Sequence, residues 1–173
     1  MEVLAFALSV IGTVCICGCS LVKGKDMRLI LILAFLSNVF VAISYILTGA
    51  WNGAVSCGVG ALQTIINYFF ERKKKPLPVW LVVLYAVMFT AVNVATFARF
   101  TDLFAILACY AYILGISQKS GKKFRVWSLT NAGLWLVYDL VSHSYGPVFT
   151  HVCQSSIAIF GMLVHDRKKG EKT

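Results

Sequence analysis

The chain has 173 residues, of which 59% are hydrophobic and only 13% are charged, and its mean hydropathy is +0.79. Soluble domains are about half apolar and about a quarter charged, so this composition excludes a soluble globular domain. A transmembrane helix takes roughly 20 apolar residues, and the chain therefore has room for about seven or eight spans and for no second, soluble domain.

The charge is strongly positive, with 16 Lys and Arg against 7 Asp and Glu. In a soluble protein this excess would suggest nucleic-acid binding. Here the basic residues occur in short clusters between apolar runs, which is typical of loops retained on the cytoplasmic side of a membrane. We therefore expect membrane lipids as partners, and no nucleic acid.

Charges and turn residues divide the chain into seven apolar runs near the spanning length, at residues 2–22, 28–48, 53–70, 78–98, 102–117, 124–143 and 146–164. The first run has Glu2 at its start where a signal peptide has basic residues, and no A-x-A cleavage pattern follows its apolar segment, so we expect a retained helix and not a signal peptide. With seven spans and the N-terminus outside, 15 of the 16 basic residues lie on the cytoplasmic side. The sequence thus predicts an all-α, multi-pass protein of a bacterial inner membrane, with the C-terminus inside.

A displacement of 93 residues aligns the two halves of the chain and matches the pairs Asn38 with Asn131, Tyr45 with Tyr138, and Gly53 with Gly146. Equivalent positions are four helices apart, so both units run in the same direction, as in parallel transporter repeats. The prediction is a 3+1+3 arrangement, with three-helix repeats at 1–75 and 99–173 and a fourth, linker helix at 76–98.

This arrangement resembles the SWEET and PQ-loop transporter superfamily. Within it, the segment Trp135-Leu-Val-Tyr-Asp139, followed by Gly146, looks most like the bacterial YgjV-like inner-membrane proteins. The resemblance implies a substrate site between the two units near the middle of the membrane. The Pro-Gln dipeptide of the PQ-loop family is absent, and the prolines are Pro76, Pro78 and Pro147, so the proline hinges of SWEET proteins are not carried over.

One helical face of the sixth run carries four polar or aromatic residues, Trp127, Asn131, Trp135 and Tyr138. The matching face of the second run carries Asn38 and Tyr45. Amides both donate and accept hydrogen bonds, and aromatic rings stack on flat ligands, so these residues are candidates for binding a neutral polar solute. The alternative is that each Asn forms a hydrogen bond between helices.

Other polar residues lie at membrane depth. Gln63 and Gln154 are near the middle of the third and seventh runs, where the resemblance implies pocket amides, and contact between helices is again the alternative. Asp139, His143 and His151 lie toward the outer side, where a carboxylate and two imidazoles could couple protons or form a gate. The alternative for Asp139 is an interfacial acid in contact with water.

The six cysteines all lie within apolar runs, which favours packing over a disulfide framework, and we expect neither a metal nor another cofactor. The small-residue patterns Ala54-x-x-x-Gly58 and Ser56-x-x-x-Gly60 favour close helix packing within the first unit, with homo-oligomer contact as the alternative.

Two functional hypotheses follow. The first is a carrier that moves a small neutral polar solute, such as a sugar, nucleoside or vitamin, by alternating access between the two units. The second is a receptor or assembly partner that uses the same bundle without transport. An enzyme is not expected, because no nucleophile with a base and no metal set occurs at membrane depth.

Overall fold

The computed structural model describes residues 2–22, 26–47, 51–95, 97, 99–141 and 145–165, apart from the side chains of residues 2, 51–53, 139, 145–147 and 149. These residues form seven α-helices and no strand: α1 (Glu2–Leu21), α2 (Met27–Leu47), α3 (Trp51–Arg72), α4 (Val79–Ala95), α5 (Asp102–Ile116), α6 (Gly121–Val141) and α7 (Tyr145–His165). Each helix coincides with one predicted apolar run to within a few residues at its ends, so the all-helical prediction is confirmed.

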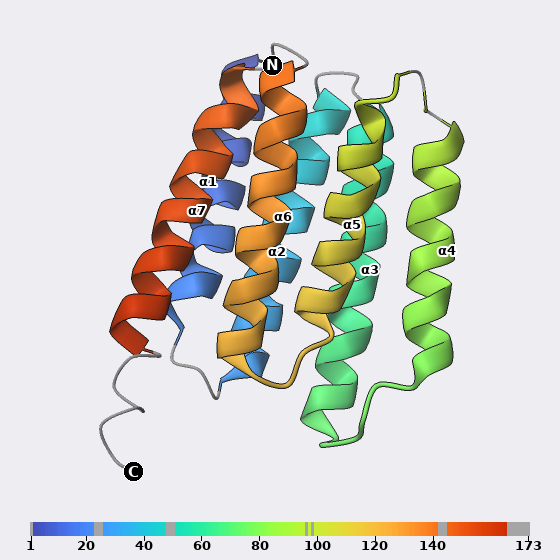
Figure 1. Ribbon diagram of the computed structural model, residues 1–173, viewed down its shortest axis with the longest axis vertical. Helices are drawn as coiled ribbons and strands as arrows, with labels where there is room; N and C mark the ends of the chain where they lie inside the picture. Colours follow the sequence, from blue (N-terminus) through green and yellow to red (C-terminus); the bar gives the residue numbers. More distant parts are fainter. Residues whose placement is uncertain are drawn as a thin grey trace.

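Consecutive helices alternate in direction, because the connections between them are short (Figure 1). As a result α1, α3, α5 and α7 all finish at the same end of the bundle, which we call the basic end. Most of the described basic residues lie there, namely Arg28, 72–75, Lys119, Lys122, Lys123 and Arg125. Arg99 lies at the opposite end, which we call the far end, in the connection between α4 and α5.

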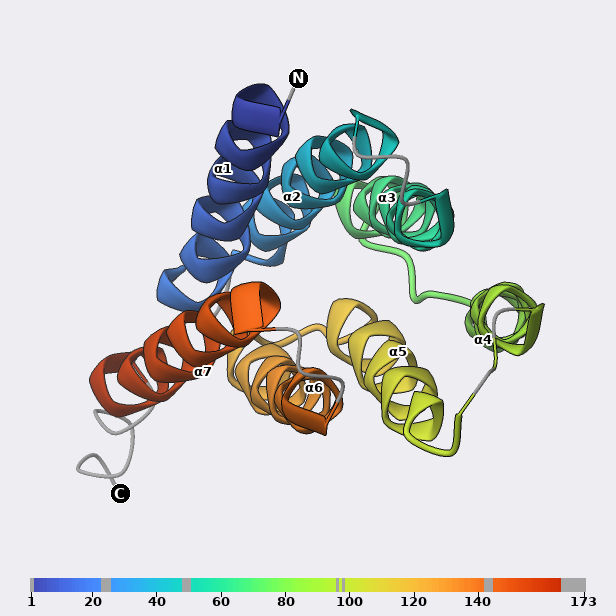
Figure 2. The ribbon, with the colours of Figure 1, turned by 90° about the horizontal axis from the view of Figure 1, so that it is seen from above.

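Seen along the bundle, α2 packs between α1 and α3, and α6 packs between α5 and α7 (Figure 2). Serine hydroxyls join α2 to α1: Ser37 Oγ donates to the Gly12 carbonyl over 2.8 Å, and Ser44 Oγ donates to the Ala5 carbonyl over 2.7 Å. Contacts of α1 with α7 and α6 connect the beginning of the chain with its end.

Helix α4 stands at the edge of the bundle and contacts α3 and α5 (Figure 2). It begins directly after Pro78, whose fixed backbone angle suits a helix start. Its buried residues Leu81, Tyr85 and Phe89 are four apart and therefore face the bundle together. Trp80 lies on the outward side of the helix, and 65% of its surface is exposed.

The bundle has an apolar exterior and buries several polar side chains in its interior. Gln63 is fully buried and Gln154 is 5% exposed, whereas Phe6 is 70% exposed and Phe160 is 57% exposed. Outward apolar side chains on so many helices would cause aggregation in water but suit contact with lipid. Interior amides are the usual means by which helices associate in a membrane.

Two helices meet the length and hydropathy of a membrane span among the described residues, Val3–Leu21 and Met27–Leu47. Val79–Ala95 and Asp102–Ile116 are apolar but shorter. Helices α3, α6 and α7 are less apolar than the other four, because amides, hydroxyls and, in α6, charged residues interrupt their apolar sequence. The sequence prediction had assigned all seven runs a near-spanning length.

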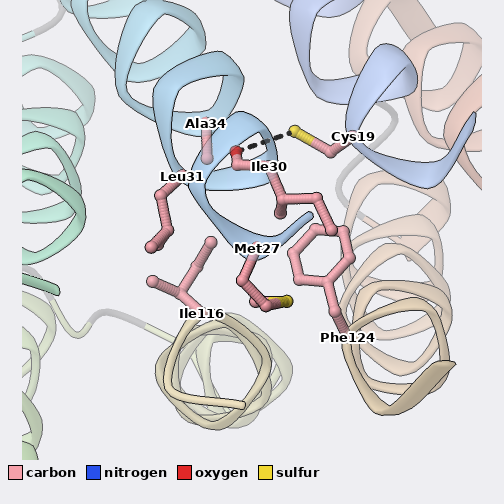
Figure 3. Packing of buried hydrophobic residues seen from close by; sticks show 7 residues of the cluster. All are labelled: Cys19, Met27, Ile30, Leu31, Ala34, Ile116 and Phe124. Atoms are coloured by element: carbon pink, nitrogen blue, oxygen red, sulfur yellow. Dashed lines mark hydrogen bonds between the residues drawn. The ribbon is translucent and has the colours of Figure 1, made fainter. Parts of the chain in front are cut away.

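A hydrophobic cluster, which we call the plug, fills the interior toward the basic end (Figure 3). It joins residues of α1, α2, α5 and α6 and comprises Cys19, Met27, Ile30, Leu31, Ala34, Ile116 and Phe124. The thiol of Cys19 also donates to the Ile30 carbonyl over 3.4 Å. The plug therefore seals the interface between the first and the second half of the chain at this end.

Candidate functional site

A cavity of about 140 Å³ lies between the two halves of the chain, lined by Asn38, Ser56, Cys57, Phe89, Cys109, Tyr112, Asn131 and Trp135. It adjoins the plug, because Asn38 follows Ala34 by one helical turn and Tyr112 precedes Ile116 by one turn. The structure thus brings together three residues that the sequence predicted as solute contacts, Asn38, Asn131 and Trp135.

The Asn38 amide lies at the boundary between the cavity and the plug. Its Nδ2 donates to the Ala34 carbonyl over 2.8 Å within α2 and to the Tyr112 hydroxyl over 2.6 Å on α5. Its Oδ1 faces Gly60 of α3, where a Cβ atom would be only 2.7 Å away. Gly60 thus leaves room for the amide, and this close packing within the first half is the arrangement that the small-residue pattern favoured.

Asn131 of α6 also forms a hydrogen bond with α5. It is 8% exposed, and its Nδ2 donates to the Ala108 carbonyl over 2.8 Å. Both asparagines therefore contact α5 through nitrogen, as the interhelical alternative proposed. Neither of these nitrogen contacts uses the amide oxygen, which can accept a hydrogen bond from a ligand hydroxyl or N–H group.

Trp135 forms an aromatic wall of the cavity and is itself held by two rings. The His151 ring of α7 stacks on it with a centroid distance of 6.0 Å and an interplanar angle of 7°. Tyr138 meets it edge to face with centroids 5.6 Å apart. Trp135 is thus oriented by its neighbours before any ligand binds, which lowers the entropic cost of stacking on a ligand.

Sequence reasoning missed the other cavity residues. Phe89 comes from α4, for which the sequence predicts only a linker, and the sequence favours packing for Cys57 and Cys109. Asn93 of α4 lies beside them, with its Nδ2 donating to the Cys109 sulfur over 3.6 Å. Tyr112 carried one signal, a hydroxyl in a mostly apolar run, but Tyr110 carries the same signal and does not line the cavity.

The remaining candidates lie outside this cavity or outside the described side chains. Gln63 Nε2 donates to the Ile113 carbonyl over 3.5 Å and joins α3 to α5, while Gln154 Nε2 donates to Ser128 Oγ over 3.3 Å and joins α7 to α6. Trp127 packs against Gly115. Tyr45 is part-buried on α2 and does not line the cavity, and the side chain of Asp139 and the whole of His143 lie outside the described residues.

The cavity has the chemistry of a site for an uncharged ligand. Its described lining contains amides, hydroxyls, thiols and three aromatic side chains, and no carboxylate or ammonium group. Its volume is close to the roughly 150 Å³ that holds a benzene-sized molecule, and below the usual range of about 300–1,000 Å³ for ligand pockets. Among the described residues, no three His, Cys, Asp or Glu side chains gather as metal ligands.

An apolar exterior with amides buried between helices is characteristic of a helical membrane protein. The model of the Imp-YgjV family, described as bacterial inner membrane protein, matches residues 3–169. The chain therefore belongs to this family, as the segment from Trp135 to Asp139 had suggested. No curated protein and no solved structure matches the chain significantly.

Proposed function

We propose that the chain is an inner-membrane carrier for a small neutral solute with a single polar ring. The observation that supports this most directly is the cavity between the two halves, in which Asn38 and Asn131 occupy positions 93 residues apart and Trp135 supplies a flat wall. A pyridine-type ring matches the cavity volume, the amide oxygens and the aromatic surface, whereas a hexose has about twice as many heavy atoms and needs more space. A larger nucleoside would require the cavity to widen.

The proposed topology has seven spans, with the N-terminus outside and the C-terminus inside. It is supported by the concentration of basic residues at one end of the bundle, since such residues are retained in the cytoplasm. Residues 1–75 and 99–173 would then be parallel three-helix repeats joined by the linker at 76–98, as in SWEET-type carriers. Alternating access would occur between them.

The test is uptake into proteoliposomes of labelled single-ring solutes, namely sugars and pyridine vitamins, with nucleosides assayed separately as larger solutes. The variant Asn131→Ala removes a cavity amide. Its matched control is Asn67→Ala, because Asn67 is also buried and also donates to an α5 carbonyl, that of Ile116 over 3.2 Å, but does not line this cavity.

Saturable uptake that Asn131→Ala abolishes and Asn67→Ala preserves is the expected result. Saturable binding without uptake would instead favour a receptor. Equally strong uptake by both variants would show that this cavity is not the solute site.

A further inference from the structure

The last carbonyl groups of α1 are capped by side chains from the other half of the chain. Arg125 Nη1 of α6 donates to the Val22 carbonyl over 3.0 Å, across 103 residues. His165 Nε2 of α7 lies 3.0 Å from the Leu21 carbonyl, across 144 residues. Because carbonyls at a helix C-terminus have no donor within the helix, such partners stabilise the helix end.

Arg125 differs from the other basic residues of this end. Its side chain is completely buried, whereas Arg28, Lys122 and Lys123 are exposed. Burying a guanidinium is costly unless hydrogen bonds and favourable dipoles compensate, and the C-terminus of a helix supplies both. Arg125 is therefore more than a topology signal, for which an exposed position would suffice.

Helices α1 and α7 meet closely beside this cap. At Gly161 of α7 an added Cβ would collide with the Ser20 carbonyl oxygen, and it would lie 3.1 Å from Arg125 Cδ. A glycine at this point lets the two backbones approach each other. The cap and this close crossing hold the end of α1 against α6 and α7.

The cap lies in the same layer as the plug, between the cavity and the basic end. Arg125 directly follows Phe124 of the plug, and Ser20 directly follows Cys19 of the plug. When the two halves separate at the basic end to open the cavity, the end of α1 has to leave α6 and α7, which it contacts. This movement would break the bond between Arg125 and Val22 and expose the plug.

We infer that Arg125 and His165 form a latch that holds the basic-end gate of the cavity closed. The inference rests on the proposed alternating-access function, and it concerns the control of that site. The latch is asymmetric: 93 residues before Arg125, the first half has Ile32, which is 41% exposed and apolar. The second half therefore controls opening at this end.

The test uses Cys19, which is fully buried in the plug, as a native reporter. A protein with Cys19 as its single cysteine is placed in vesicles, and a membrane-impermeant maleimide is added from either side. Arg125→Gln is expected to speed labelling from the basic end about tenfold, the factor that one hydrogen bond to a charged group contributes to an equilibrium. Arg28→Gln, which removes an exposed charge at the same end, should label at the unmodified rate.

Gly161→Ala tests the same gate without changing charge, because the new methyl group pushes α1 away from α7. It should also speed labelling from the basic end. If Arg125→Gln does not fold, the Gly161→Ala and Arg125→Lys proteins are labelled in its place. Unchanged labelling in the folded variants, or faster labelling from the far end alone, would overturn the latch. Faster labelling of Cys19 in the variants without any solute uptake would contradict the carrier proposal and still support the latch. Solute uptake with unchanged labelling would support the carrier proposal and contradict the latch.

Discussion

The Tyr112 hydroxyl on α5 accepts a hydrogen bond from the Asn38 amide on α2 over 2.6 Å, across 74 residues of chain. Tyr112 also packs against the plug and against the cluster that buries Phe89 of α4. This single bond thus joins the two halves of the chain at the cavity boundary. Any movement that separates the halves at this depth has to break it.

Tyr112→Phe is expected to weaken solute uptake while the bundle remains folded. An interhelical hydrogen bond in a membrane contributes only about 0.6 kcal/mol, so thermal unfolding should change little. The KM for uptake should rise about three- to tenfold, because Asn38 loses the partner that orients it at the cavity. Tyr110→Phe is the control. The Tyr110 hydroxyl forms a 2.7 Å hydrogen bond with the Thr90 hydroxyl, and neither residue lines the cavity. Equal KM changes in the two variants would contradict the role of Tyr112.

The helices could be predicted from the sequence because the breaks between apolar runs are chemically clear. Pro76 and Pro78 separate α3 from α4, and basic residues from Lys119 onward separate α5 from α6. Helix ends differ from the predicted runs by a few residues, as at α6, which begins at Gly121 and takes in two lysines. Apolarity predicts where a run can span, but it does not say where the backbone hydrogen bonds stop.

Part of the site was predictable, since the repeat indicated Asn38 and Asn131 and the polar and aromatic face of α6 indicated Trp135. Asn38 and Asn131 recur at one displacement, and the structure places both at the cavity. Cys109 and Phe89 had no such signal, because α4 and α5 are apolar on every face and the sequence cannot indicate which face turns inward. Gln63 was assigned a site role from its polarity, and the structure shows its contact with the Ile113 carbonyl of α5.

Trp135→Ala is expected to reduce uptake at least tenfold, since it removes the wall on which a ring stacks. Aromatic stacking contributes about 1–3 kcal/mol per ring, which corresponds to roughly one to two orders of magnitude in affinity. Trp135→Phe should retain part of the activity. The control is Trp127→Phe, because Trp127 lies on the same face of α6 but packs against Gly115. Uptake that depends more on Trp127 than on Trp135 would contradict the assignment of the wall.

Two glycines of α3 give a matched pair for the position of Asn38. In Gly60→Ala the new methyl group would lie 2.7 Å from Asn38 Oδ1, so the amide must move and uptake should fall several-fold. In Gly58→Ala the methyl group meets nothing within 4 Å. That variant should retain uptake and gain about 0.5–1 kcal/mol of helix stability. Uptake kinetics and thermal unfolding of both variants check this, and an unaffected Gly60→Ala protein would show that the Asn38 position does not matter.

The cavity cysteines allow the solute site to be mapped directly. Cys57 lines the cavity and is part-buried, while Cys153 of α7 is also part-buried but does not line the cavity. In proteins that retain only one of these cysteines, a small maleimide should label both. A transported solute at saturating concentration should slow labelling of Cys57 about tenfold, since bound solute excludes the reagent, and should leave Cys153 unchanged. Protection of Cys153 alone would place the site on the α7 side of the bundle, away from the cavity between the halves.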